Sequence, residues 1–252
     1  MDLRLNGRNA LITGGTKGIG RAIAETLASE GCNVAICARN EAEVSAATES
    51  LQSKGVTAFG RSVDVADGDA LKSWVSAAAE ALGGVDCLVS NVSGGNTPGE
   101  DGWRANFEHD VLGAIRLVES SMPFLERSDN ASITMIASSA ALEKFIAAVG
   151  YNSMKAAVIQ YAGALAQDVG SKGIRVNAIS PGPIMVKGGS WDFIKENMRA
   201  LYDSTLDAVA LGRLGSAEEV AAQVALLASP LGSFTTGANI VIDGGLTKRI
   251  QF

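Results

Sequence analysis

The architecture of this chain can be read from one octapeptide, Thr13-Gly14-Gly15-Thr16-Lys17-Gly18-Ile19-Gly20. It follows a short apolar run at residues 9–13 and opens a helical pattern at residues 19–31. A glycine-rich turn between a strand and a helix is the context in which such a turn can hold a dinucleotide. Gly14 permits the tight turn, Gly18 lets the backbone approach a pyrophosphate, and Gly20 lets the helix pack close to the strand. Free amide groups of the helix N-terminus, from Ile19 onward, would then face the phosphates.

Short apolar runs alternate with longer helical patterns along the rest of the chain. Seven strands are predicted, at residues 9–13, 33–38, 57–63, 85–90, 132–137, 174–179 and 239–242. The predicted helices span residues 19–31, 41–54, 69–82, 103–125, 151–170 and 217–228. Strands of this length separated by helices form right-handed βαβ units. We therefore predict an α/β fold: a single Rossmann-type doubly wound domain over residues 1–252, with a seven-stranded parallel sheet and helices on both faces.

One segment, at about residues 185–211, lies outside this alternation and is predicted to be a lid-like insertion. Its amphipathic part runs from Trp191 to Tyr202. The segment carries a stripe of large apolar and aromatic side chains: Met185, Trp191, Phe193, Ile194, Met198, Leu201 and Tyr202. Such a stripe at helical spacing is typical of core packing. Part of it could instead form an apolar wall for a substrate, which favours hydrophobic or alicyclic carbonyl compounds over free sugars.

Composition narrows the possible partners and location. The formal net charge of −6 is spread over interspersed acidic and basic residues, so nucleic acid is not expected as a partner. No apolar stretch is long enough to span a bilayer, and the charged segment at residues 1–8 does not resemble a signal peptide. We therefore expect a cytoplasmic protein without a membrane partner.

Neither the cysteines nor the histidine indicate a metal site. Cys32, Cys37 and Cys87 are odd in number and lack paired spacing, so we expect them to pack as small hydrophobic residues. His109 is the only histidine, and no cysteine or carboxylate cluster accompanies it. We expect it to lie at the surface or in an interface.

The residues at the end of the second strand indicate which nicotinamide cofactor fits. A carboxylate there would bind the ribose 2′-hydroxyl, but this chain has Ala38 and then Arg39. Lys17 adds a second cation within the glycine turn, where Thr16 is a further candidate cofactor contact. Two cations with no carboxylate beside them favour the 2′-phosphate of NADP(H). The alternative is that both are ordinary solvated charges and that the cofactor is NAD(H).

Polar residues at the ends of the third and fourth strands are candidates for further cofactor contacts. Asp64, followed by Val65, is placed to accept a hydrogen bond from an adenine amino group. Asn91 ends the fourth strand, in a turn with Ser93 and Gly94 where the backbone must leave room for a ribose. Asp64 or Asn91 could instead cap a neighbouring helix.

Three side chains form a candidate proton-transfer set. Tyr151 and Lys155 share one face of a helix because residues at i and i+4 are neighbours there. A free tyrosine has a pKa of about 10, and lowering it to about 7 takes roughly 4 kcal/mol of preferential stabilisation of the phenolate. A lysine ammonium and an oxidised nicotinamide ring both act in that direction. Ser138 follows the fifth strand at its carboxyl end, where its hydroxyl can hydrogen-bond the substrate oxygen.

Taken together, these residues resemble the short-chain dehydrogenase/reductase family over almost the whole chain. The resemblance rests on the turn at residues 13–20, Asp64, the Asn91 region, and Ser138, Tyr151 and Lys155, and it continues through Arg175-Val176-Asn177, Pro181-Gly182-Pro183 and Asp243-Gly244-Gly245. It is greatest to the branch of 3-oxoacyl carrier-protein reductases and secondary-alcohol dehydrogenases. The resemblance implies that Tyr151, Lys155, Pro181, Gly182 and Ile184 also contact the cofactor. It further implies a homotetramer in which helices 103–125 and 151–170 pair across an interface.

This chain departs from the family pattern at three places. Val92-Ser93 replaces the usual Ala after Asn91, and Val186 replaces a threonine that touches the nicotinamide carboxamide. Asp110 stands where the family has a fourth catalytic residue, an asparagine that supports a water linking the lysine to solvent. An ionised Asp110 beside Lys155 would stabilise the ammonium and alter this relay. We expect Asp110 instead to be a tolerated isostere and the relay to be intact.

The sequence thus predicts an oxidoreductase that interconverts a ketone and a secondary alcohol with NADP(H), acting on a small apolar or acyl-type carbonyl substrate. One alternative is an NAD-linked secondary-alcohol dehydrogenase. The other is a non-catalytic dinucleotide sensor on the same fold, although such a protein has no need for Ser138, Tyr151 and Lys155 in register.

Overall fold

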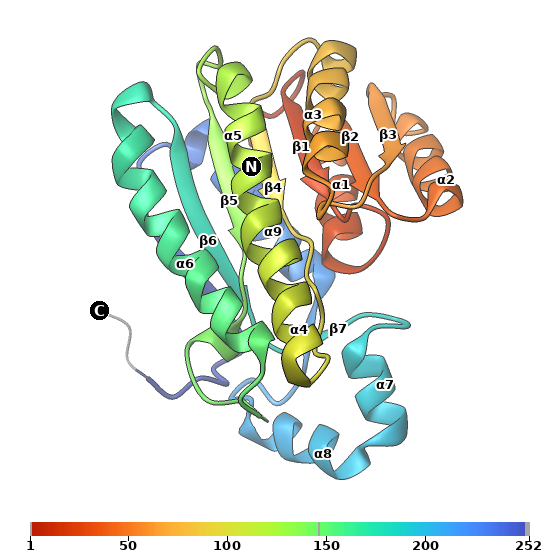
Figure 1. The fold of residues 1–252 in the computed structure, drawn as a ribbon, viewed down its shortest axis with the longest axis vertical. Helices are drawn as coiled ribbons and strands as arrows, with labels where there is room; N and C mark the ends of the chain where they lie inside the picture. Colours follow the sequence, from red (N-terminus) through yellow and green to blue (C-terminus); the bar gives the residue numbers. More distant parts are fainter. Residues whose placement is uncertain (1, 146, 250–252) are drawn as a thin grey trace.

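The computed structural model describes residues 2–145 and 147–249, and its core is one parallel sheet (Figure 1). The predicted domain also included residues 1, 146 and 250–252, which lie outside the described residues. Seven strands form the sheet in the order β3-β2-β1-β4-β5-β6-β9. Their bounds are β1 (Asn9–Thr13), β2 (Asn33–Ala38), β3 (Ala58–Ser62), β4 (Cys87–Ser90), β5 (Ser132–Ile136), β6 (Arg175–Pro181) and β9 (Asn239–Ile242). The predicted α/β class and the seven parallel strands are confirmed.

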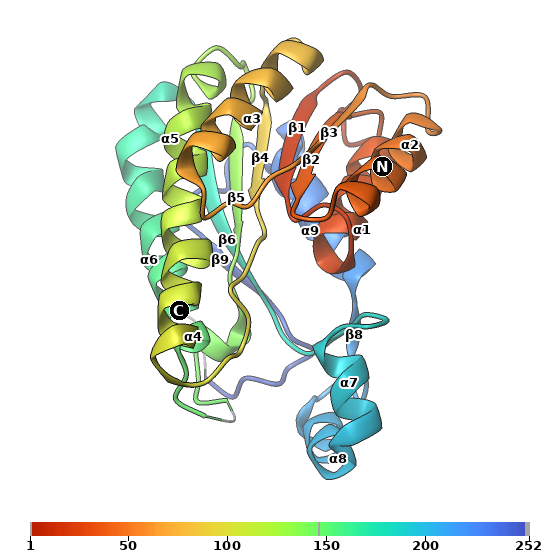
Figure 2. The ribbon, with the colours of Figure 1, turned by 45° about the vertical axis from the view of Figure 1, so that its right-hand side comes forward.

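Helices cover both faces of this sheet (Figure 2). One face packs against α1 (Gly18–Ser29), α2 (Glu41–Gln52) and α9 (Ala217–Ala228). The other face packs against α3 (Gly68–Leu82), α5 (Gly113–Leu125) and α6 (Gly150–Val169). The observed elements agree with the predicted ones to within a few residues at their ends.

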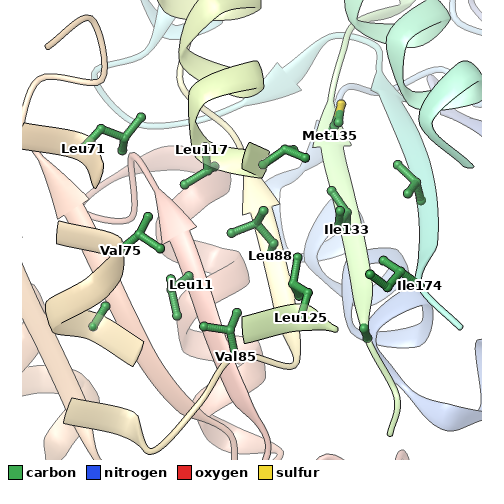
Figure 3. Close-up of a cluster of buried hydrophobic side chains, with 14 of the residues drawn as sticks. Leu11, Leu71, Val75, Val85, Leu88, Leu117, Leu125, Ile133, Met135 and Ile174 are labelled. Atoms are coloured by element: carbon green, nitrogen blue, oxygen red, sulfur yellow. The ribbon is translucent and has the colours of Figure 1, made fainter. Parts of the chain in front are cut away.

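Alternating side chains along each strand supply the two halves of the core. Leu11 and Leu88 are fully buried on the face covered by α3 and α5, as Figure 3 shows. Their chain neighbours Ile12 and Val89 are fully buried on the face covered by α1 and α9. Successive residues of a strand point to opposite faces, so a strand covered on both sides is apolar at nearly every position. This explains why the strands appear as continuous apolar runs in the sequence.

The strand order reverses at β1, which lies between β2 and β4. In doubly wound sheets the connections leave opposite faces at such a point, and a crevice opens beyond the carboxyl ends of the two strands. The glycine turn follows β1 and Asn91 follows β4, so both lie at this crevice. The topology therefore places the predicted cofactor residues at the expected edge of the sheet.

The helix predicted at 103–125 is longer and less regular than expected. It begins as α4 (Gly99–Asn106), continues as a π-helical segment η1 (Phe107–Leu112), and ends as α5. A π-helical turn holds one more residue than an α-turn and changes the direction of its side chains. The predicted asparagine-equivalent residue, Asp110, lies within this segment and is buried.

The insertion at 185–211 forms two short helices, α7 (Ser190–Asn197) and α8 (Arg199–Ala208), beyond the carboxyl edge of the sheet (Figure 1). The stretch predicted as one amphipathic run at 191–202 breaks at Met198, whose φ of −134° and ψ of 53° are not helical. A two-stranded ladder of β7 (Ile184–Met185) and β8 (Gly215–Ser216) closes the insertion at its base. The described residues also form three 3₁₀ turns: η2 (Ser139–Ala141), η3 (Gly170–Lys172) and η4 (Pro230–Gly232).

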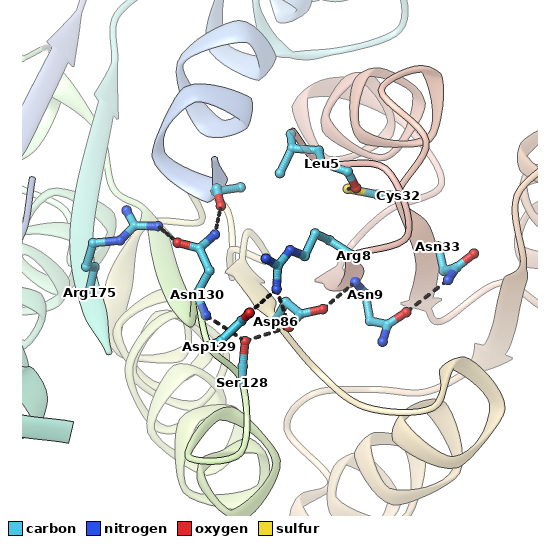
Figure 4. A network of polar contacts seen from close by, with 11 residues as sticks. Leu5, Arg8, Asn9, Cys32, Asn33, Asp86, Ser128, Asp129, Asn130 and Arg175 are labelled. Carbon is cyan, nitrogen blue, oxygen red and sulfur yellow. Dashed lines mark hydrogen bonds and ion pairs between the residues drawn. The ribbon is translucent and has the colours of Figure 1, made fainter. Parts of the chain in front are cut away.

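The amino edge of the sheet is closed by a polar network (Figure 4). Asp86 accepts hydrogen bonds from the backbone N–H of Asn9 at 2.8 Å and from Ser128 Oγ at 2.5 Å. Arg8 Nη1 lies 3.6 Å from the same carboxylate. Asn33 Nδ2 donates to Asn9 Oδ1 at 3.0 Å, which joins the starts of β1 and β2.

The cysteines behave as small core residues, as predicted. Cys32, Cys37 and Cys87 are free and buried. Burial raises the pKa of the Cys37 thiol to about 12 and that of Cys87 to about 11, so both stay protonated at neutral pH. Within the described part of the chain, we find no helix with the length and apolar character needed to cross a bilayer.

Candidate active site

The glycine turn is held closed by Asn91. The Asn91 side chain donates from Nδ2 to the carbonyls of Thr13 at 3.1 Å and Gly14 at 3.3 Å, and its backbone N–H donates to Thr13 Oγ1 at 3.1 Å. A Cβ on Gly20 would lie 2.2 Å from the Gly14 carbonyl oxygen and 2.4 Å from Asn91 Nδ2. Gly14 has a φ of +69°, which disfavours any side chain. Asn91 therefore acts as a brace for the turn and does not cap a helix.

Gly18 supplies the exposed backbone of the turn. It has a φ of +60°, and the nearest atom to a Cβ built there would be Val186 Cγ1 at 3.7 Å. Lys17 is the N-cap of α1 but makes no side-chain capping bond, so the first amide groups of the helix keep their donors for another partner. A negatively charged phosphate group fits this arrangement.

A cavity of about 750 Å³ lies at the carboxyl edge of the sheet and collects most of the predicted site. It is lined by eleven of the predicted site residues: Lys17, Gly18, Ile19, Asn91, Ser93, Ser138, Tyr151, Lys155, Pro181, Gly182 and Ile184. Eight other predicted residues are not part of its lining: Gly14, Thr16, Gly20, Arg39, Asp64, Val65, Gly94 and Asp110. The structure therefore joins the glycine turn and the three proton-transfer candidates in one space.

The three proton-transfer candidates come from two elements that meet at this cavity. Ser138 follows β5 and is the N-cap of η2, where its Oγ accepts the N–H of Ala140 at 3.2 Å. Tyr151 and Lys155 come from the first turns of α6, and Lys155 Nζ lies 5.9 Å from the centroid of the Tyr151 ring. At that distance the ammonium acts on the phenol through its charge. The hydroxyl of Ser138 keeps its own proton available to an oxygen in the cavity.

Lys155 is buried between a carbonyl and a carboxylate. Its Nζ donates to the Ile136 carbonyl at 2.8 Å and lies 2.8 Å from Asp110 Oδ1. Lys155 Nζ and Asp110 Oδ1 therefore form an ion pair, and the geometry between them does not meet that of a hydrogen bond. The other Asp110 oxygen, Oδ2, accepts the backbone N–H of Gly94 at 2.9 Å. Asp110 thus contacts the lysine directly, which the isostere interpretation did not include.

One of the two cations predicted for the 2′-phosphate site, Lys17, has a carboxylate near it, contrary to expectation. Glu43, in the first turn of α2, places Oε2 3.7 Å from Lys17 Nζ, and it accepts a hydrogen bond from Thr16 Oγ1 at 3.3 Å. Lys17 and Arg39 remain exposed. Glu43 belongs to the helix that follows the second strand, so the residues at the end of that strand do not reveal it.

Asp64 is committed to local contacts at the carboxyl end of β3. Its Oδ1 accepts the N–H of Ala66 at 3.0 Å and lies 3.2 Å from His109 Nε2. Asp67, not Asp64, caps α3, so the capping alternative for Asp64 is wrong. His109 keeps 19% of its side chain exposed, so it is not fully exposed at the surface, and its expected place in an interface stays a prediction.

The apolar stripe of the insertion lies at the cavity and not in the core. Phe193 and Met198 are 60% and 46% exposed, and no residue of α7 is buried. Trp191, Ile194, Met198 and Leu201 line the cavity. The alternative interpretation of this stripe, as a substrate wall, agrees with the structure better than core packing does.

Sequence reasoning missed part of the cavity wall outside the insertion. Phe145 contributes a ring whose centroid lies 6.0 Å from that of Trp191, tilted by 49°. Asn152 Nδ2 donates to the carbonyls of Phe145 and Ala147 at 3.3 and 3.1 Å and so fixes this loop to α6. Asn96 and Leu246 also line the space. An aromatic residue shortly after Ser138, in a segment otherwise rich in small residues, was the available signal.

Comparison with known proteins gives matches along the whole length. A family model described as enoyl-(acyl carrier protein) reductase matches residues 14–247. Isoepoxydon dehydrogenase of Penicillium expansum is 40% identical over 258 residues, with 98% of each chain covered. The 7α-hydroxysteroid dehydrogenase of Escherichia coli K12 is 32% identical over 255 residues, covering 99% of this chain and 98% of that one. L-Sorbose reductase of Gluconobacter frateurii, in complex with NADPH and L-sorbose, has a TM-score of 0.91 at 31% identity, covering 99% of this chain and 100% of that chain.

Proposed function

Because this chain belongs to the short-chain dehydrogenase/reductase family of oxidoreductases acting on CH–OH groups, we propose that it interconverts a ketone and a secondary alcohol by hydride transfer with NADP(H). One observation carries the proposal. Ser138, Tyr151 and Lys155 line the same cavity as Gly18 and Ile19 of the glycine turn. A proton donor set and a phosphate-binding turn thus share one space.

The reaction needs a hydride and a proton, and the side chains of this chain handle the proton. The nicotinamide ring, when bound, supplies or accepts the hydride. In reduction, the Tyr151 hydroxyl gives its proton to the substrate oxygen, while the Ser138 hydroxyl donates a hydrogen bond to the same oxygen. The Lys155 ammonium stabilises the phenolate that remains. In oxidation, the phenolate takes the proton back.

Support for NADP(H) comes from the cations at the carboxyl ends of β1 and β2. Lys17 and Arg39 are exposed there, and the matched L-sorbose reductase is in complex with NADPH. Glu43 is the one observation that favours the NAD-linked alternative, because a carboxylate repels a 2′-phosphate. Binding of NADPH and NADH, compared by quenching of protein fluorescence, separates the two. Tighter binding of NADH would refute the NADP(H) assignment.

The cavity wall indicates a neutral, largely apolar substrate. Phe145 and Trp191 form an aromatic pair in this wall, and Ile194 and Leu201 also line the cavity. The charged side chains that line it in the described residues are Lys17, Lys155 and Lys187. We therefore infer an apolar or acyl-type carbonyl compound, with the insertion at 185–211 acting as a lid over it.

A single substitution tests the proposed chemistry. Tyr151→Phe removes the transferable proton, and we expect turnover to fall by about 10²–10⁴-fold, because general acid–base groups contribute that much. NADPH loss is followed against β-ketoesters, cyclic ketones and acyl thioesters. NADPH affinity should stay within about twofold of the wild-type value.

Tyr161→Phe is the matched control, since it removes a hydroxyl from the same helix at a half-buried core position. It should leave turnover unchanged. Unimpaired turnover in Tyr151→Phe would exclude the phenol as the acid. Cofactor binding without turnover on any carbonyl substrate would instead favour the non-catalytic sensor.

The quaternary state and the location remain predictions. Trp103 and Phe107 are 40% and 44% exposed on the first of the two helices expected to pair. Exposed aromatic residues of this size favour an interface with a second copy. Sedimentation at several protein concentrations tests the homotetramer. Fractionation of cells that express the chain tests the cytoplasmic location.

A further inference from the structure

Asp110 is a buried carboxylate in an unusual backbone segment. It lies in the π-helical segment η1, and none of its side chain is exposed. Its side chain reaches Lys155 of α6, which packs against η1, and a wider turn of this kind changes the direction of side chains. An ionised carboxylate so placed needs a cation and hydrogen-bond donors around it.

One Asp110 oxygen contacts a cation, and the other accepts a hydrogen bond from a backbone N–H. Oδ1 lies 2.8 Å from Lys155 Nζ, and 4% of the lysine side chain is exposed. Oδ2 accepts the backbone N–H of Gly94 at 2.9 Å. A Cβ on Gly94 would lie 2.6 Å from the Ala105 backbone, so this turn packs directly on the helix that carries Asp110. The carboxylate therefore links α6, which carries Tyr151, to the turn after β4.

Other charged groups near this pair are directed elsewhere. His109, the next residue along η1, faces Asp64, and Glu108 pairs with Arg116 of α5 at 3.2 Å. On α4, Arg104 pairs with Glu100 at the surface. On α6, the titratable neighbour is Tyr151, whose ring lies 5.9 Å from Lys155 Nζ. Asp110 is thus the group that balances the lysine charge in the described structure.

We propose, building on the proposed function, that Asp110 is a positioning residue that compensates the charge of Lys155 and thereby sets the pH range of proton transfer. A neutral amide would leave the full field of the ammonium on Tyr151. The carboxylate cancels part of that field, so the ammonium favours the phenolate less than it would beside an amide. The same carboxylate keeps the lysine fixed relative to Gly94.

Asp110→Asn tests this proposal with almost no change in shape. The amide oxygen can still accept the Gly94 N–H, but the negative charge is lost. We expect the pH of half-maximal alcohol oxidation to move down by about one unit. This is the lower end of the roughly 1–3 units that a charge within about 4–6 Å produces, because Asp110 acts on Tyr151 through its contact with Lys155. Asp101→Asn is the control, because it removes the same charge from the exposed first turn of α4. It should leave the profile unmoved.

Asp110→Ala removes both the charge and the acceptor for Gly94, so its comparison with Asp110→Asn separates the two effects. It also serves as the test if Asp110→Asn does not fold. It should show the same downward pH shift together with weaker NADPH binding, because the Gly94 turn loses its acceptor. An unchanged profile in both variants would overturn the proposal. An upward shift would also overturn it, because it would mean that Lys155 has lost its proton instead.

A spectroscopic titration distinguishes failure of this inference from failure of the proposed function. Phenolate absorbance in the near ultraviolet, taken as the difference between each protein and its Tyr151→Phe version, follows Tyr151 without any substrate. The Tyr151 phenolate should form at lower pH in Asp110→Asn than in the wild type. If the wild type turns over no carbonyl substrate but the two titrations differ in this way, the proposed function is refuted and the charge compensation by Asp110 stands. If the wild type and Asp110→Asn titrate at the same pH, the inference about Asp110 is refuted and the proposed function stands.

Discussion

The two edges of the sheet each bury one cation, and they treat it differently. At the carboxyl edge, Lys155 faces a carboxylate and a cavity. At the amino edge, Arg175 is 7% exposed and donates to neutral acceptors: the carbonyls of Leu227 at 2.5 Å, Gly232 at 3.2 Å and Ser229 at 3.4 Å, and Asn130 Oδ1 at 3.4 Å. Figure 4 shows the contact with Asn130. Burial lowers the pKa of Arg175, yet its guanidinium remains charged at any physiological pH.

The acceptors of the two cations indicate their tasks. Arg175 satisfies carbonyls at the carboxyl end of α9, where a helix has unpaired acceptors and a partial negative charge. Lys155 has three donors and makes one hydrogen bond, to the Ile136 carbonyl, beside its ion pair with Asp110, so it keeps a donor for the cavity that it lines. Arg175 directs its four hydrogen bonds to the protein and so stabilises the fold, whereas Lys155, which lines the cavity, can also serve a ligand.

The largest expected difference between the edges is in turnover. Ser138→Ala should lower kcat by about 10²–10³-fold, as loss of one donor to a reacting oxygen does. The melting temperature should change little, because the capping bond to Ala140 N–H belongs to a single 3₁₀ turn. Steady-state kinetics and thermal unfolding are measured on the same preparation.

Ser139→Ala is the matched control for this substitution. Ser139 is the neighbouring residue and is equally buried, at 8% exposure. Its loss should leave kcat within about twofold, because the predicted substrate contact belongs to Ser138. Equal losses in the two variants would mean that the 3₁₀ turn, and not one hydroxyl, carries the effect.

The converse prediction concerns the amino edge. Arg175→Met leaves the buried Leu227 carbonyl without its donor, whereas the Ser229 and Gly232 carbonyls keep backbone N–H donors, so we expect about 1–3 kcal/mol of destabilisation. For a chain of this size that lowers the melting temperature by about 2–12 °C. The kcat of the folded fraction should stay at the wild-type value.

Arg127→Met controls for the change of side chain at an exposed position. It should alter stability by no more than about 0.5 kcal/mol. Loss of kcat in Arg175→Met below its melting transition would show that the two edges are coupled, and the division between them would then fail.

Features that are local in sequence were predictable for this chain. The strands follow from apolar runs, and the glycine turn follows from its position between β1 and α1. Tyr151 and Lys155 follow from helical spacing, because both belong to one element. Long-range contacts were not predictable in this way. Lys155 meets Asp110 across two helices, and the π-helical turn that directs Asp110 has no sequence pattern of its own.

The contact between Glu43 and Lys17 is also long-range and was not predictable from the sequence. The substitution that tests it has the smallest expected effect of those proposed here. Glu43 lies 3.7 Å from Lys17 because α2 packs beside the glycine turn, and strand ends alone do not reveal this. Glu43→Gln keeps an acceptor for Thr16 Oγ1 but removes the repulsion of a 2′-phosphate. Exposed pairs are worth about 0.2–1 kcal/mol, so NADPH should bind up to about fivefold tighter, with NADH affinity, kcat and melting temperature unchanged.

Glu41→Gln is the control, because it removes the same charge from an exposed position in the same first turn of α2. It shows whether the effect depends on where the lost charge lies. It should tighten NADPH by less than Glu43→Gln does. The gain from Glu43→Gln should shrink as salt is added, because exposed charges are screened over about 10 Å at 0.1 M ionic strength. A gain shared equally by NADH would show that Glu43 faces some other part of the cofactor. Glu43 would then stabilise the glycine turn through Thr16 without discriminating between NADPH and NADH.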